Sequence, residues 1–556
     1  NLTLGSDTSD LTVANNLSLS NSETISTQGA DLILQGSTTI ASGSKIDASD
    51  GGTLDFQGGG SNAGEVDASG AVFKIGANLS VTNLLTTNST TTWNLANSNL
   101  DLTGGGRLEL GGNVDLNQII TNNQASFKFL EDATITRNQG FTLGGFNLNN
   151  FDITLGSATT DLTLDHSLST GSNDTSPPGS IATQGADLTI TGDVAKLTAN
   201  TSISSTGGTF NFDQGLTIVD ASLDLEDTTL EVGVSMSKSG GTLTMDGTNL
   251  RLLSDLTLTS DSAVNLNQLN LQNKTLTFQS MSSLSVTEQV VLDNAGEKIL
   301  WVESSQLALN GGISIGANGE FKWKKPNNLT IGNIFLNGGV LELSETEAQT
   351  FAITSNIQLQ ADSEIIFNGG STLNYSGAEI LLGNLLTLSG NGQFQNTNNF
   401  NLSGGNGKLK LSEIVLAKLT TSADSLGLDI DGNSSIASLT VKNLTPVSVA
   451  DGKSISGNIF INAGGTLKLN ETGTVASSVE MIGGSLDVDE SLTLSGALSQ
   501  SGAATIDVAQ DKTLTYSGGA VNLGANTLTL NGKGTFSNTN ALVLNNADSL
   551  LSINDT

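Results

Sequence analysis

The chain of 556 residues has no cysteine, one histidine, four prolines and only 4% aromatic residues. Without cysteine it has no thiol nucleophile and no thiolate metal site. His166 is the only histidine. A single histidine excludes histidine–metal clusters, most zinc sites, and histidine-based catalytic triads that need a second helper residue of this kind. His166 follows a strand-like segment and corresponds to Asn15 or Asn16 in the repeat described below. A position that accepts asparagine predicts a solvated corner.

Positive charge is also scarce, since 21 Lys and Arg face 54 Asp and Glu, a formal net charge of −33. Nucleic acids and anionic membrane surfaces require a basic face, so neither is expected as a partner. No apolar run approaches the roughly 18 residues of a membrane helix. No signal peptide or initiator methionine precedes Asn1. We therefore expect a processed or excerpted piece of a longer product.

Short segments of the form Leu-Thr-Leu are the main pattern present, and they recur roughly every 6 to 12 residues. Apolar residues at positions i and i+2 predict strands with one buried face. The Gly-Gly, Asn-Gly and Ser-Gly pairs between them supply the positive φ angles of tight corners. Examples of the pattern are residues 17–19, 32–34, 108–110, 256–258, 341–343, 467–469 and 528–530.

Three all-β architectures are compatible with short strands and glycine corners. A β-sandwich array needs hairpins and usually an aromatic core residue in each domain, and a propeller needs blade motifs that are not found here. A parallel β-solenoid needs short strands, small corner residues and stacked aliphatic side chains, which this sequence has. With about 20–25 residues per coil, we expect roughly 25 coils and a rod on the order of 100–130 Å long.

The first half of the chain contains an internal repeat. The hexapeptide TQGADL occupies residues 27–32 and again 183–188, where 183 − 27 = 156. The spacing between matches grows across residues 172–179, as an insertion in a loop would cause. We predict two copies of one β-solenoid repeat, residues 1–150 and 151–305. Other segments match in the same order: 10–13 with 161–164, 51–56 with 207–212, 66–69 with 219–222, and 114–118 with 264–268.

The second half contains its own pair of copies, predicted as residues 306–455 and 456–556, the latter expected to be incomplete. Tyr375 and Tyr516, the only two tyrosines, occupy equivalent places in the two copies. We predict that the hexapeptides at residues 27–32 and 183–188 of the first pair are structural corners, with glycine at the turn. Further matching segments of the second pair are 332–337 with 457–462, 341–346 with 467–472, 372–377 with 513–518, and 390–398 with 531–540.

Residues 300–330 differ from the rest because they hold tryptophan and the one tight basic cluster. Lys322, Lys324 and Lys325 surround Trp323. One interpretation is a junction between the two pairs of repeats, with aromatic side chains covering an irregular coil. The other is a docking or carbohydrate-stacking patch, with Trp323 as a platform and the lysines facing an acidic partner.

Paired carboxylates are the remaining candidates for chemistry, because they can support glycoside hydrolysis or a calcium-assisted lyase reaction. Neither candidate group has a basic or aromatic cluster beside it that would form a sugar cleft. We therefore predict that the chain is not an enzyme. The two groups are Asp424, Asp429 and Asp431, and Asp487, Asp489 and Glu490.

Calcium is the one cofactor that the sequence leaves open. Asp429 and Asp431 lie in the segment DIDGN, which loosely matches a calcium loop but lacks its bidentate glutamate. The GGxGxD repeat of calcium-binding β-rolls does not occur; residues 404–407 are followed by Lys408. The prediction is no cofactor and no built metal site, with weak cation binding at the acidic surface left open.

Leu-x-Leu strands, Gly and Asn corners, absent cysteine and acidic character together resemble the passengers of bacterial autotransporters and filamentous-haemagglutinin-like adhesins. The resemblance covers the whole chain but rests on rhythm and composition. It implies a right-handed parallel β-helix, an extracellular or cell-surface location, and a secreted rod used for adhesion, sheath or filament building. The implied partners are further repeats of the same protein end to end, or host and matrix glycans and surface proteins. The alternative is a carbohydrate-binding or carbohydrate-cleaving, lyase-like β-helix protein.

Overall fold

The computed structural model shows an all-β chain whose described residues form 72 strands and no helix. It contains parallel coils stacked as a β-solenoid of about 23 turns, which confirms the predicted fold class. No helix among the described residues is long and apolar enough to span a membrane. The described residues are 1–95, 98–169, 179–192, 195–198, 201–245, 247–259, 263–272, 274–279, 283–292, 298–302, 307–323, 329–343, 348–398, 400–402, 405–422, 425–544 and 546–554.

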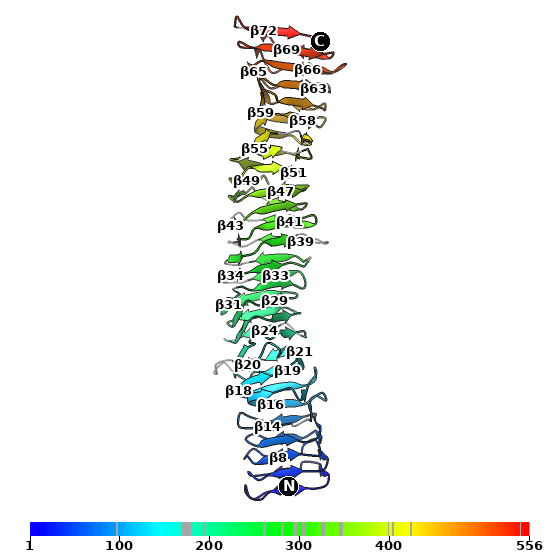
Figure 1. Cartoon of the computed structure of the whole chain (residues 1–556), viewed down its shortest axis with the longest axis vertical. Coiled ribbons are helices and arrows are strands. Elements are labelled where there is room, and N and C mark those ends of the chain that lie inside the picture. Colours follow the sequence, from blue (N-terminus) through cyan, green and yellow to red (C-terminus); the bar gives the residue numbers. More distant parts are fainter. Residues whose placement is uncertain are drawn as a thin grey trace. The chain divides into compact units, whose positions relative to one another are not determined.

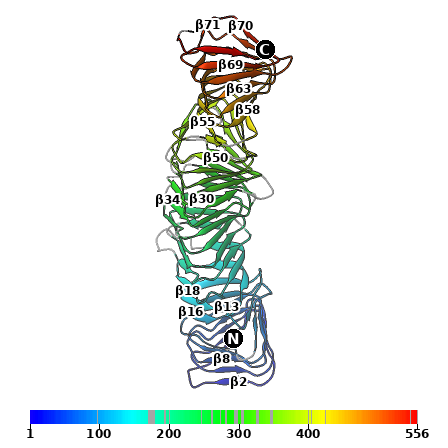
Figure 2. The ribbon, with the colours of Figure 1, turned by 45° about the horizontal axis from the view of Figure 1, so that its top comes forward.

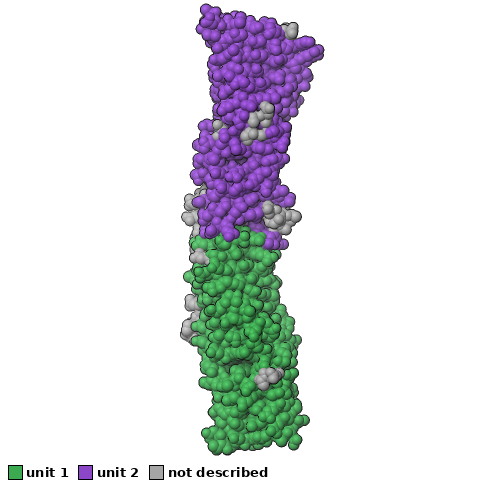
Figure 3. Space-filling model, in the orientation of Figure 1, with its two compact units in different colours: residues 1–270, 279–284 green, residues 271–278, 285–556 purple. Residues whose placement is uncertain are grey.

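The chain divides into two compact units, which Figure 3 shows in different colours. Unit 1 comprises residues 1–270 and 279–284, and unit 2 comprises residues 271–278 and 285–556. Each unit is built from the same element, a coil of short strands joined by corners. The finer division into four repeats, with boundaries near residues 150, 305 and 455, stays a prediction.

In unit 1, strands about one coil apart in sequence lie side by side (Figures 1 and 2). Leu11 in β2 pairs in parallel with Leu32 in β5, which pairs with Leu54 in β8. Parallel pairing with the same register from coil to coil puts side chains of one kind directly above each other. The strands of this ladder are β2 (Leu11–Val13), β5 (Leu32–Leu34), β8 (Thr53–Phe56), β11 (Val72–Ile75) and β14 (Thr92–Asn94).

The period-2 pattern of the sequence separates the inside of each coil from the outside. Leu54, Phe56 and Phe73 are completely buried, and the Phe56 and Phe73 rings meet edge to face at 5.9 Å between centroids. Asp55 and Lys74, which alternate with them, remain half-exposed. Burying each such leucine or phenylalanine contributes about 1.5–3 kcal/mol, so the interior column is the main source of stability.

The repeated hexapeptide forms the same corner in both copies. Gln28 and Gly29 have φ angles of 50° and 86°, and Gln184 and Gly185 have φ angles of 53° and 85°. Glycine accepts this left-handed conformation without steric cost. The buried strand β5 begins directly after the corner, at Leu32, as the sequence predicted.

The aspartate of the hexapeptide links three coils at that corner. The Asp31 amide donates to Oδ1 of Asp10 at 3.0 Å, and Oδ1 of Asp31 accepts from the Thr53 amide at 2.7 Å. In the second copy Asp187 makes the same two bonds, to Asp161 at 3.0 Å and from Thr209 at 2.6 Å. The equivalence of the two copies therefore extends to individual hydrogen bonds.

In unit 2 the largest ladder carries an unbroken aliphatic column. Leu341 pairs with Ile365, Ile365 with Leu388, and Leu388 with Leu411, each one coil further along. All four side chains are completely buried. The strands concerned are β42 (Gly319–Trp323), β45 (Val340–Leu343), β48 (Ser363–Phe367), β51 (Leu385–Gly390), β54 (Lys408–Leu411) and β56 (Gly427–Ile430).

The two tyrosines of unit 2 occupy equivalent positions, as predicted. Tyr375 ends β49 (Thr372–Tyr375) and Tyr516 ends β67 (Thr513–Tyr516). Each buried hydroxyl accepts a backbone N–H from 18 residues earlier, from Ile357 at 3.2 Å and from Leu498 at 3.1 Å. A buried N–H without a partner is costly, so each tyrosine completes the hydrogen bonding of one corner.

Candidate functional site

Trp323 cannot act as the stacking platform of the predicted docking patch. Its side chain is 2% exposed, and its ring lies edge to face against Phe351 at 4.7 Å between centroids. The Phe321 ring stacks on it at 6.4 Å. Trp323 is therefore a core residue, because a buried indole offers no face to a ligand. The sequence suggested an aromatic cover for an irregular coil, and this packing agrees with that alternative.

Lys322, the second member of the patch, is held by two carboxylates. Its Nζ lies 3.2 Å from Oε1 of Glu320 and 3.1 Å from Oε2 of Glu342. Burial lowers the pKa of Lys322, but the hydrogen bonds and charges of Glu342 and Glu320 outweigh it and the pKa is raised. Lys324 and Lys325 lie outside the described residues, so the docking role of the patch stays a prediction for them.

The two acid groups are neutralised by lysines on neighbouring coils. Lys408 Nζ lies 2.6 Å from Asp429, and Lys410 Nζ lies 2.5 Å from Asp431. Among the described residues no group of three or more histidine or acidic side chains could hold a metal ion. Asp429 and Asp431 therefore serve as ion-pair partners across a coil boundary, and Asp424 lies outside the described residues.

The second acid group has the same arrangement. Lys468 Nζ lies 2.7 Å from Asp489 and 3.7 Å from Asp487, and Lys512 Nζ lies 2.5 Å from Glu490. Burial and the neighbouring carboxylate of Asp489 raise the pKa of Asp487, and Lys468 opposes them. Burial is the largest cause of this pKa shift and the like charge of Asp489 is the next.

His166 lies in β21 (Leu162–Ser169), where the pairing register with β19 (Phe141–Asn147) shifts. Leu143 pairs with Leu164, whereas Gly145 pairs with Ser167. Two residues, Asp165 and His166, thus lie opposite one residue of the neighbouring strand. Such an irregularity bends the strand. The solvated corner stays a prediction for His166.

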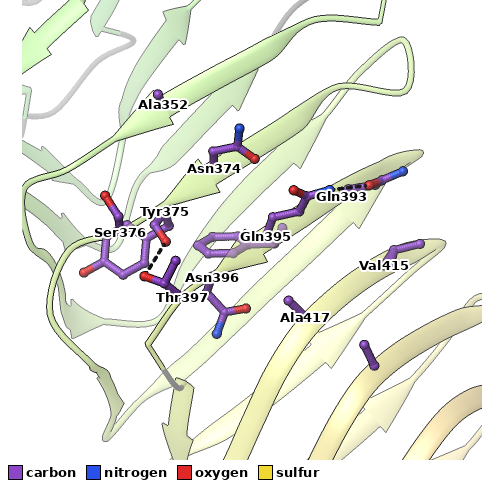
Figure 4. Close-up of a pocket in the computed structure, with 12 residues that line it drawn as sticks. Ala352, Asn374, Tyr375, Ser376, Gln393, Gln395, Asn396, Thr397, Val415 and Ala417 are labelled. Atoms are coloured by element: carbon purple, nitrogen blue, oxygen red, sulfur yellow. Dashed lines mark hydrogen bonds between the residues drawn. The ribbon is translucent and has the colours of Figure 1, made fainter.

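A hollow of about 580 Å³ on the outer face of one sheet of unit 2 is the best candidate for a ligand site. It lies over β49, β52 (Gly392–Asn396), β55 (Ile414–Thr421) and β57 (Ser434–Val441), as Figure 4 shows. Its volume is within the range of small-molecule sites. The hollow is lined by Ala352, Asn374, Tyr375, Ser376, Gln393, Phe394, Gln395, Asn396, Thr397, Val415, Ala417 and Ala437.

Three exposed carboxamides form one side of the hollow. Asn374 of β49 pairs with Gln395 of β52, so the two side chains leave the sheet at neighbouring positions. Gln395 Nε2 donates to Oε1 of Gln393 at 2.9 Å, the dashed line between the two in Figure 4. The opposite side is apolar and shallow, because Val415, Ala417 and Ala437 have short side chains.

The hollow exists because a strand of one coil faces a corner of the next. β55 is continuous, but the coil before it breaks into β52 and β53 (Phe400–Leu402), and both pair with β55. The Asn396 side chain bridges the break, accepting from the Lys418 amide at 3.1 Å and donating to the Lys418 carbonyl at 3.0 Å. Asn396 is 4% exposed. It positions the hollow by replacing the missing backbone pairing.

Two strands further along unit 2 keep this pairing register but not the carboxamides. In β67 and β70 (Thr535–Asn538), Thr515 pairs with Ser537 in the register that joins Asn374 to Gln395. The three positions of Asn374, Gln393 and Gln395 hold Thr515, Thr535 and Ser537. Because hydroxyl residues satisfy the same fold, the carboxamides are not required for folding.

The internal repeat aligns residues 372–377 and 390–398, which line the hollow, with residues 513–518 and 531–540, but it does not identify the hollow. The one signal in this alignment is outward-facing Asn and Gln in one copy where the other copy has Thr and Ser. The depth of the hollow could not be predicted, because it depends on how β55 meets two strands. Comparison of the chain with protein-family models, with curated proteins and with solved structures found no match.

Proposed function

We propose that this chain is a non-enzymatic structural rod, part of a large repetitive surface adhesin, sheath or filament protein. The observation that carries the proposal is the parallel stacking of coils within each unit, with columns of buried aliphatic side chains in the ladders. Such coils contact only their neighbours, so stability grows with each added coil and the length of the element is freely adjustable. That property suits a spacer or filament.

The surface supports the same role. The net charge of −33 disfavours lateral association of copies, while lysines on neighbouring coils relieve repulsion between acidic side chains. Lys468 is one example, because its Nζ lies 3.7 Å from Asp487 and 2.7 Å from Asp489 on the next coil. Extracellular or cell-surface placement belongs to this proposal and rests on the resemblance to bacterial passenger proteins.

The partners that we propose are further repeats of the same protein, joined end to end. A parallel ladder presents unpaired N–H and C=O groups wherever it ends, and another coil of the same kind satisfies them. The matched copies within the chain support this, because their corners use identical hydrogen bonds. Glycans or surface proteins of a host or matrix are the partners proposed for the outward faces.

Size-exclusion chromatography with negative-stain imaging tests the rod. About 23 coils at about 4.8 Å each predict a particle about 110 Å long. A compact, equidimensional particle would contradict the proposal. A reducing-sugar assay on polysaccharides tests the enzymatic alternative separately, and we expect no turnover from a chain whose candidate acids are paired with lysine.

A further inference from the structure

We propose that the hollow over β49, β52, β55 and β57 binds an uncharged saccharide of one to three rings. This goes beyond the structural role, because a rod needs no such site. Its volume of about 580 Å³ accommodates a ligand of that size. The site is built from side chains of five successive coils, from Ala352 to Ala437, so it exists only where those coils are stacked.

The carboxamides supply both kinds of hydrogen-bonding group that sugar hydroxyls require. Within the described residues Gln393 and Gln395 bond to each other through one N–H and one oxygen. The part of the chain that the structure describes makes no hydrogen bond to the remaining donors of Gln393, to the oxygen of Gln395 or to the Asn374 amide. A hydroxyl both donates and accepts, so the amides of Asn374 and Gln395 on neighbouring coils, and of Gln393 two residues away on the same strand as Gln395, can each bond a ring hydroxyl.

The floor of the hollow suits the C–H face of a sugar. Ala417, Ala437 and the exposed Val415 form a short apolar surface beside the amides. Tyr375 and Phe394 belong to the lining but are at most 1% exposed. Their rings pack in the core, so the affinity comes from the amides and the alanine floor rather than from aromatic stacking.

The charge of the lining selects an uncharged ligand. None of the twelve lining residues is ionisable apart from the buried Tyr375, in a chain with 54 acidic residues. An acidic ligand would find no cation in the lining and would be repelled by the surrounding charge, and a cation would find no carboxylate. The nearest lysine, Lys418, bonds to the Thr397 carbonyl at the rim, at 3.0 Å.

An extended peptide is a poorer fit, because the sheet offers it no edge. β52 pairs with β49 on one side and with β55 on the other, and β55 pairs with β57. A peptide that binds by strand addition needs unpaired backbone groups, which this face lacks. The ligand must therefore be recognised by side chains alone.

The experiment exchanges the amides for the residues of the sister coils. The variant Asn374→Thr, Gln393→Thr, Gln395→Ser should fold normally, since Thr515, Thr535 and Ser537 occupy the same register. Saturation-transfer NMR and calorimetry with maltotriose, cellotriose and N,N′,N″-triacetylchitotriose should show at least one binding the natural chain, and the variant should bind it at least tenfold more weakly. Gln358→Thr, an exposed change on β47 (Ile357–Ala361), is the matched control and should bind normally.

A second variant blocks the hollow without touching the amides. Ala437→Trp fills the floor from an exposed position and should also abolish binding, with an unchanged melting midpoint. The proposal is overturned if none of the three sugars binds, if the triple variant binds them as the natural chain does, or if trigalacturonate binds equally well. Particle length by imaging is unaffected by these variants, so failure here is distinguishable from failure of the rod.

Discussion

Arg137 is a charged residue in the interior of a coil, and replacing it should stabilise the protein. It is 8% exposed, and its buried Nε and Nη1 atoms have no hydrogen-bond partner within the described residues. Burial lowers the pKa of its guanidinium, which shows that the charged form is disfavoured there. Its guanidinium makes a cation–π contact with the Phe141 ring, whose centroid lies 5.7 Å from Cζ.

The coil before it shows what the position accepts. Asp115 pairs with Thr136, so the next residues, Leu116 and Arg137, occupy the same place in successive coils. Leu116 is completely buried. Replacing buried charge by a hydrophobic residue of similar size typically stabilises by about 1–4 kcal/mol. The lost cation–π contact offsets about 1 kcal/mol of that. We therefore expect Arg137→Leu to stabilise unit 1 by up to about 3 kcal/mol.

Thermal melting followed by circular dichroism measures this effect. A gain of that size in a unit of this length raises the midpoint by up to about 6 °C. Arg107→Leu is the control, because Arg107 pairs with Glu109 and its side chain is 46% exposed. The control should change stability by less than about 0.5 kcal/mol. If Arg137→Leu lowers the midpoint, the guanidinium has a stabilising partner and the reasoning is refuted.

Three further predictions concern the corners and the charged columns. Tyr375→Phe should lower the free energy of unfolding in denaturant by about 1–3 kcal/mol, because it leaves the Ile357 N–H without a partner and removes the bond that Tyr375 donates to the Ala378 carbonyl. Tyr516→Phe should cost less, because it removes only the bond to the Leu498 N–H. Equal losses would contradict this. The raised pKa of Asp487 means that its ionised form destabilises the fold, so Asp487→Asn should stabilise by about 0.5 kcal/mol at pH 7. That gain should vanish as the pH falls below the ordinary carboxyl pKa, and a gain independent of pH would argue against titration. Millimolar calcium or EDTA should shift the melting midpoint by less than about 1 °C, because lysines already neutralise Asp429 and Asp431; a larger shift would reveal a structural cation.

The fold could be predicted because its determinants are local and repeated. Alternation at Leu32 and Leu34 fixes which face is buried, and the positive φ angles of Gln28 and Gly29 fix the corner. Each coil repeats the same pattern of alternating apolar residues and corner residues, so a departure from the pattern in one segment does not change the predicted architecture. The match between the hexapeptides at 27–32 and 183–188 was enough to predict equivalent structure.

The surface could not be predicted to the same extent, because it depends on which residues meet across coils. The sequence alone allows Trp323 to be an exposed platform, but the alternation of buried and exposed residues along β42 places its side chain inside, against Phe351. The lysines beside Asp429 and Asp487 lie one coil away, and only the register identifies them as partners. The hollow beside Gln395 arises from a break between two strands that no local pattern records.

Distances between spin labels test the parallel, in-register stacking most directly, and the absence of cysteine makes the labelling simple. One outward column of unit 2 contains Val340, Thr387 and Ser448. Thr387 lies two coils beyond Val340, and Ser448 lies five coils beyond it. The pairings of β45, β48, β51, β54, β56 and β58 (Leu444–Val449) define this column. Cysteines at 340 and 387 should lie about 10 Å apart, and cysteines at 340 and 448 about 24 Å apart. Separations that do not grow by about 4.8 Å per coil would contradict the stacked β-solenoid.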